Sequence, residues 1–247
     1  MAGIYAQQGQ VDQAIALYQQ SLEIKERIGN VQGKAATLHE IAGIYAQQGQ
    51  VEQAIALYQQ SLEINERIGN VHGKAATLSQ MGVLLQNQGK VEEALALHQQ
   101  SLELKESIGN LQGKATSLHQ IAIIYADQGQ VDQAIALYQQ SLEINERIGN
   151  VQGKATTLHQ MAGIYADQGQ VDQAITLYQQ SLEIKERIGD VRGKAMTLAM
   201  MGQILAMNGD FQTAISYLQE SLTILQHLKS PDAATVQSFL EQVTRKK

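Results

Sequence analysis

The sequence contains no cysteine, no tryptophan and a single proline. Without cysteine the chain can form neither disulfides nor thiolate metal sites, and it has no cysteine nucleophile. Its net charge of −6 is modest, and its lysines and arginines are spread along the chain instead of being gathered in one stretch. Nucleic-acid binding requires a basic face that displaces counterions, so we expect no nucleic-acid partner.

The sequence also lacks the segments that direct a protein to a membrane. The first residues, MAGIYAQQGQ, do not combine a basic segment with an apolar stretch, so they do not predict a signal peptide. No apolar stretch approaches the roughly 20 residues that a membrane-spanning helix needs. We therefore expect a cytoplasmic protein without a membrane partner.

What the sequence does contain is an internal repeat with a step of forty residues. A glycine recurs at this step, and so do an alanine and a leucine further along each repeat. The glycines, at which each repeat turns, are Gly9, Gly49, Gly89, Gly129, Gly169 and Gly209. A fixed period of this kind is typical of an elongated array in which each repeat packs on its neighbours. We therefore predict an array of six repeats over residues 1–229.

Each repeat carries the signals of two helices. Asn30 can cap the first helix, because its side chain accepts hydrogen bonds from the free N–H groups of the first turn. That helix has an apolar stripe of helical period formed by Leu38, Ile41, Ala42 and Tyr45. Gly49 then ends it, since glycine readily takes the left-handed conformation that follows a helix. The second helix has a broader apolar surface that includes Val51, Ala54, Ile55, Tyr58 and Leu62. The pattern predicts an all-α chain.

These residues resemble the tetratricopeptide repeat, which has a large residue, Leu-Gly and Tyr on its first helix. A glycine turn follows, and then an alanine and an aromatic residue on the second helix. The matching positions are Leu38, Ile41, Ala42, Tyr45, Gly49, Ala54 and Tyr58. The family's tryptophan and its closing proline are missing, and a GNVQGK-like joint lengthens each repeat to forty residues. This form is similar to the repeats of LGN/Pins spindle-orientation scaffolds and of cyanobacterial multi-repeat proteins. The resemblance implies a right-handed α-solenoid.

The two ends of the array differ. Ser230, Pro231 and Asp232 combine a capping hydroxyl, a proline and an acid, the pattern of a helix start. We predict a C-terminal capping helix over residues 230–247. At the front, Met1 aligns with Met161, which lies in the middle of a first helix. We expect the first repeat to be truncated, so that the native protein continues upstream or two chains pair there as a homodimer.

Two patterns suggest ligand sites but favour structural roles. Residues 29–34, GNVQGK, are similar to a phosphate-binding loop, but they are one residue short and lie between helices instead of after a strand. His39, His119 and His159 recur at equivalent positions, but helix spacing allows only His119 and His159 to converge on one ion, and no third ligand is evident near that pair. We therefore predict no metal site and no cofactor.

No catalytic arrangement is evident. The serines and threonines occupy helix faces or caps, and the acids of the SLEIKER and SLEINER segments lie among Lys, Arg and Asn on a face that we expect to be solvated. His98 replaces the tyrosine found at Tyr58 and Tyr138, so we expect it in the core. We predict that the chain is not an enzyme.

In the proteins that this chain resembles, the first helices line a concave face on which a peptide binds. The corresponding stripe varies more between repeats than the packing stripe, and its glycines would allow a partner's backbone to approach closely. Solenoid curvature favours such a surface for binding. The predicted groove residues are His39, Gly43, Gln47, Ser79, Val83, Asn87, His119, Ile123, Asp127, His159, Gly163, Asp167 and Gln203.

One specialised role is disfavoured by the same stripe. Family members that bind chaperone tails hold a C-terminal carboxylate with Lys and Asn on this face. In this sequence the corresponding positions carry residues such as His39, Ser79 and Gly43. We therefore expect a scaffold that binds a peptide or protein segment other than a chaperone tail. Two alternatives stay open: self-assembly through the incomplete first repeat, or a role as the interaction or sensory part of a longer signalling protein.

Overall fold

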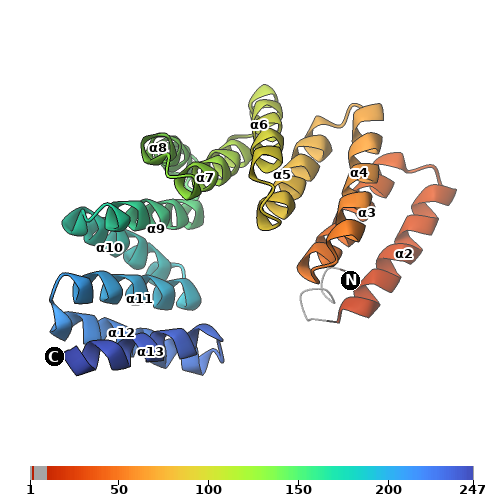
Figure 1. Cartoon of the computed structure of the whole chain (residues 1–247). Helices are drawn as coiled ribbons and strands as arrows, with labels where there is room; N and C mark the ends of the chain where they lie inside the picture. Colours follow the sequence, from red (N-terminus) through yellow and green to blue (C-terminus); the bar gives the residue numbers. More distant parts are fainter. Residues whose placement is uncertain (1, 3–9, 247) are drawn as a thin grey trace. The chain divides into compact units, whose positions relative to one another are not determined.

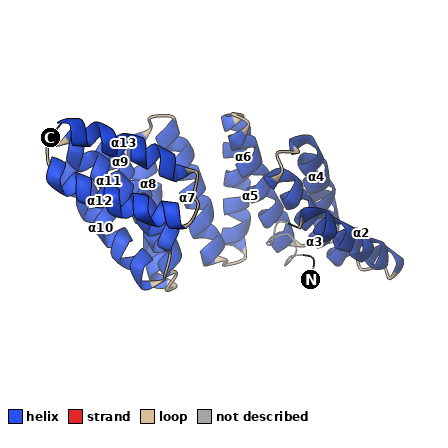
Figure 2. Ribbon diagram, turned by 90° about the horizontal axis from the view of Figure 1, so that it is seen from below, coloured by secondary structure: helices blue, strands red, loops and turns tan. Residues whose placement is uncertain are grey.

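The computed structural model describes residue 2 and residues 10–246, and every regular element in that part of the chain is an α-helix (Figure 1). Figure 2 shows the same helices from a second direction, joined by short turns. The turn predicted at Gly9 and the alignment of Met1 lie outside the described residues. In chain order the helices are α2 (Val11–Arg27), α3 (Val31–Gln47), α4 (Val51–Arg67), α5 (Val71–Asn87), α6 (Val91–Ser107), α7 (Leu111–Asp127), α8 (Val131–Arg147), α9 (Val151–Asp167), α10 (Val171–Arg187), α11 (Val191–Met207), α12 (Phe211–His227) and α13 (Asp232–Lys246).

The internal contacts separate the chain into two compact blocks, residues 1–124 and residues 125–247. In the first block α3 pairs with α4 and α5 pairs with α6, while α2 packs on α3 and α4 packs on α5. In the second block α9 pairs with α10 and α11 with α12, while α8 packs on α9 and α10 on α11. The prediction of an all-α array of paired helices is therefore confirmed within each block.

The turns between helices use the residues that the sequence indicated. Gly49 has a φ of +75°, in the left-handed region. The N–H of the next residue, Gln50, donates to the carbonyl oxygen of Tyr45 at 2.9 Å, which satisfies a carbonyl at the end of α3. At the start of α3, the Asn30 side-chain oxygen accepts a hydrogen bond from the N–H of Gly33 at 2.8 Å. Both predicted roles are confirmed.

The core of each hairpin is formed by a small residue on one helix and a large residue on its partner. Ala42 and Ala54 are fully buried, and they share a cluster with Tyr58, Met81 and Leu84. Alanine at the crossing allows the two backbones to approach, and the tyrosine ring fills the space beside it. This repeated contact sets the positions of the side chains on α3 and α5.

A ladder of buried serines on the second helices was not predicted from the sequence. The hydroxyl of Ser61 donates to the carbonyl oxygen of Ala35 on the first helix of the same hairpin, at 2.9 Å. The same bond is made by Ser101 to Ala75, Ser181 to Ala155 and Ser221 to Ala195, at 2.7, 2.8 and 2.7 Å. In these four hairpins the serine of the QQSLE or QESLT segment therefore joins the two helices.

The expectation of a solvated face is wrong for the Lys or Asn that lies one helical turn after Ser61, Ser101, Ser141 and Ser181. Lys105 is 6% exposed and Asn65 is 3% exposed. Burial is tolerated because hydroxyl groups satisfy their polar ends: the Lys105 ammonium donates to Ser117 at 2.9 Å, and the Asn65 amide donates to Ser61 at 3.3 Å. The acids of the same segments, such as Glu63, are exposed as predicted.

The last helix, α13, packs on α12 and touches α11. Val236 and Val243 on its apolar face are buried in a cluster with Leu218 and Leu225 of α12. The predicted capping hydroxyl is present, because Ser230 accepts a hydrogen bond from the N–H of Asp232 at 3.3 Å.

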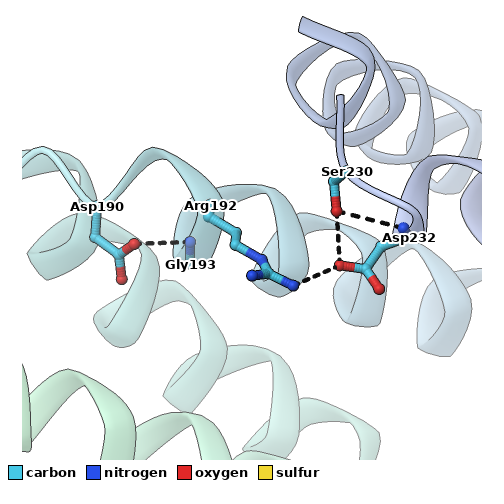
Figure 3. A network of polar contacts seen from close by, with 5 residues as sticks. All are labelled: Asp190, Arg192, Gly193, Ser230 and Asp232. Atoms are coloured by element: carbon cyan, nitrogen blue, oxygen red, sulfur yellow. Dashed lines mark hydrogen bonds and ion pairs between the residues drawn. The ribbon is translucent and has the colours of Figure 1, made fainter. Parts of the chain in front are cut away.

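The start of α13 is also tied to α11 by an ion pair. Arg192 of α11 reaches Asp232 at 3.0 Å, and Ser230 donates to the same carboxylate oxygen at 2.9 Å (Figure 3). These bonds, that from Ser230 foremost, lower the pKa of the Asp232 carboxyl. Asp190 caps α11 in the same view by accepting from the N–H of Gly193 at 2.8 Å.

Candidate functional site

The first block contains a cavity of about 740 Å³ over α3 and α5, with side chains of α2 and α4 at its margin. This volume lies in the range of about 300–1,000 Å³ that is usual for ligand sites. Five of the predicted groove residues line it: His39, Gly43, Gln47, Val83 and Asn87. The remaining lining residues are Tyr18, Glu40, Ile44, Ala46, Tyr58, Gln80 and Leu84.

His39 is fixed in this cavity by two contacts. Its Nδ1 lies 3.1 Å from the hydroxyl of Thr77 on α5, and its ring meets the ring of Tyr58 edge-on, with centroids 5.2 Å apart at 66°. Burial lowers the pKa of His39, although the nearby Glu40 acts in the opposite direction. The ring is therefore a rigid, neutral part of the cavity wall near pH 7.

Gly43 lies one turn further along α3 and leaves the cavity floor open. A Cβ placed on it would meet only the Tyr58 hydroxyl, at 3.5 Å, which is an ordinary contact distance. Burial raises the pKa of Tyr58 to about 12, and Glu40 adds to the effect, so this hydroxyl keeps its proton.

Glu40 and Tyr18 are cavity residues that the sequence analysis did not identify. The Tyr18 hydroxyl of α2 is 3.5 Å from a Glu40 carboxylate oxygen of α3, at the long end of hydrogen-bond distance. Burial first, and Glu40 second, raise the pKa of Tyr18. A sequence signal existed, because Gln80, Gln120, Gln160 and Met200 stand where this repeat has an acid.

Ser79 is the one predicted residue of α3 and α5 that does not line the 740 Å³ cavity. Its hydroxyl lies 3.0 Å from the hydroxyl of Ser101 and accepts a hydrogen bond from the Lys105 ammonium at 2.7 Å. Serine is too short to reach the cavity as His39 does, and these polar contacts within the hairpin hold it instead.

A second cavity of about 280 Å³ lies towards the start of α3. It shares His39 and Glu40 with the larger cavity, and it continues past Ser61, Asn65 and Thr77 as far as Gln32. The two cavities together follow α3 on both sides of His39 and Glu40. We call the two cavities together the α3 groove.

The predicted residues of the later repeats take similar positions on their helices. His159 repeats the geometry of His39, with Nδ1 3.1 Å from the hydroxyl of Thr197 and its ring 5.0 Å from that of Tyr178. Burial lowers the pKa of His119 and of His159 to about 4, aided at His159 by the charge of Lys185. Ile123, Gly163 and Gln203 are half-buried, whereas Asp127 and Asp167 are exposed.

Other ligand classes find little support in the described residues. Within that part of the chain no group of three His, Asp or Glu side chains could hold a metal ion. The GNVQGK joint acts as a helix stop and start: Gly29 has a φ of +70°, and Asn30 caps α3. The helices of residues 10–246 also include none that is long and apolar enough to cross a membrane.

Stacked hairpins with a small-residue crossing and a glycine turn define a helical repeat protein of the solenoid class. The chain belongs to the tetratricopeptide repeat family, whose model matches residues 1–67, 73–147 and 153–227. No curated protein matches the sequence.

Several solved structures are similar in fold. BtubC (BKLC) from P. vanneervenii has a TM-score of 0.77 and 19% identity, covering 87% of this chain and 91% of that one. A STAND signal-transduction ATPase with a tetratricopeptide repeat sensor, from Pyrococcus horikoshii, has a TM-score of 0.82 and 20% identity over 98% of this chain and 37% of that one. A Rap protein complexed with Competence and Sporulation Factor has a TM-score of 0.71 and 16% identity, covering 99% and 73%. At these identities the likeness shows the fold alone.

Proposed function

We propose that the protein is an interaction scaffold that binds an extended segment of a partner protein along the first helices of its repeats. The observation that carries this proposal is the 740 Å³ cavity over α3 and α5, which five of the predicted groove residues line. Tetratricopeptide repeats are typical of interaction scaffolds, and the Rap protein of similar fold is complexed with Competence and Sporulation Factor.

The composition of the groove also favours binding over catalysis. Its wall combines aromatic rings and small residues with amides such as Gln47, Gln80 and Asn87. Amide side chains both donate and accept hydrogen bonds, as a peptide backbone requires of its partner. His39 already contacts both Tyr58 and Thr77, so its position does not have to be ordered by the ligand.

The test is selection of random dodecapeptides on the immobilised protein, followed by affinity measurement on matched variants. Gly43→Ile fills the cavity with a residue that the chain itself carries at the equivalent Ile123. Ala56→Thr, on the exposed face of α4, is the control, and it copies Thr176. Selected peptides should bind Gly43→Ile at least tenfold more weakly and Ala56→Thr unchanged. Equal binding to both variants would show that the groove is not the site.

A further inference from the structure

The α3 groove carries one unbalanced charge. Of the described residues that line its two cavities, Glu40 is the only charged one, and neither lining contains a lysine or an arginine. The equivalent position in the other repeats carries Gln80, Gln120, Gln160 or Met200, so the negative charge belongs to this repeat alone. A carboxylate can accept several hydrogen bonds, whereas among the described residues Glu40 accepts only the long one from Tyr18.

Hydrogen-bond counting around His39 adds a second acceptor. Thr77 has a single hydroxyl proton, which it donates to the carbonyl oxygen of Gly73 at 2.9 Å. The same bond back to the preceding turn recurs at Thr37 and Thr197. With that proton assigned to Gly73, Thr77 accepts from His39, and we infer the tautomer in which Nδ1 carries the ring proton and Nε2 is an acceptor. Two adjacent residues of the groove, His39 and Glu40, thus both accept hydrogen bonds.

A ligand that satisfies two acceptors and one negative charge must be a cation with several donors. The guanidinium group of arginine presents five N–H donors in a planar fork, and it stacks well on aromatic rings. Tyr18, which is half-buried, lines the cavity beside Glu40 and supplies such a ring. The ammonium group of lysine has only three donors around a point charge, so it matches this arrangement less well.

The length of the groove sets the length of the occupant. Its lining runs along α3 from Gln32 to Gln47. At about 1.5 Å per helical residue this span is roughly 22 Å. An extended chain advances about 3.3 Å per residue, so about seven residues cover the span. Because Glu40 lies near the middle of the lined stretch, the cationic residue belongs near the centre of such a segment.

We propose that the α3 groove recognises an extended protein segment of about seven residues with a central arginine, which pairs with Glu40 and donates to His39. This inference rests on the proposed function and specifies the partner's chemistry. It predicts that recognition is confined to the repeat that carries Glu40.

The experiment compares two fluorescent heptapeptide pools that differ only at the central residue, arginine in one and its neutral isostere citrulline in the other. The other six positions are randomised over uncharged amino acids. Affinities are measured by fluorescence anisotropy for the full chain, for Glu40→Gln and for Gly43→Ile. Glu40→Gln introduces the residue that the chain carries at Gln160, and a circular dichroism melt verifies that both variants fold.

We expect the wild type to bind the arginine pool about fivefold more tightly than the citrulline pool, the upper end of what an ion pair with an exposed carboxylate such as Glu40 gives. Glu40→Gln should remove this preference, and Gly43→Ile should weaken the binding of both pools. Equal binding of the two pools, a preference that survives in Glu40→Gln, or binding of neither pool overturns the inference.

Two outcomes separate this inference from the proposed function. If both pools bind equally and Gly43→Ile weakens both, the groove binds peptides but does not select arginine. If Gly43→Ile changes neither, the groove itself is not the site. Free arginine serves as competitor: competition at the same concentration as the pool would show a small-molecule site and would overturn the choice of a protein segment.

Discussion

The hydroxyl of Ser61 on α4 donates a hydrogen bond to the carbonyl oxygen of Ala35 on α3, across the hairpin that carries the α3 groove. Ser61 is fully buried. A hydrogen bond in this setting contributes about 1 kcal/mol. We expect Ser61→Ala to lower the free energy of unfolding by about that amount, measured by urea denaturation. Gln60→Ala, an exposed change on the same helix, should have little effect. Similar losses for both variants would show that the ladder bond contributes nothing specific.

Gly43 and Gly82 occupy similar helices but should respond oppositely to alanine. A Cβ on Gly43 meets the Tyr58 hydroxyl at 3.5 Å, whereas a Cβ on Gly82 would lie 2.8 Å from Nε2 of His98. We expect Gly43→Ala to raise stability by about 0.5–1 kcal/mol, because alanine loses less backbone entropy in a helix. Gly82→Ala should lower it by about 1–3 kcal/mol through overpacking. Thermal melts of the two variants test the contrast, and a gain from Gly82→Ala would contradict the tight contact.

The helices and turns were predictable because their causes are local. Asn30 and Gly49 act within a few residues of their own positions, and the forty-residue step repeats the same signals. The role of the groove stripe as a peptide-binding surface stays a prediction, although helical periodicity identifies the stripe. Its members His39 and Val83 do meet in one cavity.

The residues that the sequence could not place depend on contacts between helices. Tyr18 reaches Glu40 from twenty-two positions away, and Ser61 reaches Ala35 from twenty-six. Lys105 looks like a surface residue in its own segment, but hydroxyl groups on two neighbouring helices satisfy it in the interior. Periodicity shows which face of a helix is buried, but it does not show which polar groups on that face find partners.

His98 is fully buried, and neither of its ring nitrogens has a hydrogen-bond partner within the described part of the chain. In the last repeat the equivalent position carries Leu218, which packs against Gly202 as His98 packs against Gly82. We expect His98→Leu to raise stability at pH 7 by about 1–3 kcal/mol, because it removes unsatisfied polar groups from the core. Equilibrium urea unfolding measures the change, and a destabilised variant would contradict this account.

His98 should also make the stability of the protein depend on pH. Burial, and then the charge of Lys105, lowers the pKa of His98 to about 4, against 6.5 in an unfolded chain. Between these values the unfolded chain binds a proton that the folded chain does not, so stability falls as the pH is lowered from 6.5 to about 4. The stability of His98→Leu should fall less over this pH range. The part of the fall that is due to His119 and His159 should remain. Identical pH profiles for variant and wild type would show that His98 does not titrate this way.

Lys105 should affect the stability of the protein at alkaline pH. Burial lowers the pKa of its ammonium group to about 8, against 10.5 in an unfolded chain. Above pH 8 the folded chain loses this proton before the unfolded chain does, so this group adds stability as the pH rises from 8 towards 10. Because one pKa unit corresponds to about 1.4 kcal/mol, the buried charge should cost at least about 1 kcal/mol at pH 7.

Lys105→Asn tests this directly, because the chain itself places asparagine at the equivalent Asn65 and Asn145, where the amide bonds to the ladder serine. We expect the variant to be about 1 kcal/mol more stable at pH 7, and to lack the gain between pH 8 and 10. Lys90→Gln is the control, since it removes an exposed charge and copies Gln50 and Gln130. It should keep the alkaline gain. If the two variants have the same alkaline profile, the gain comes from net charge, and the alternation of lysine and asparagine along the ladder has no effect on stability.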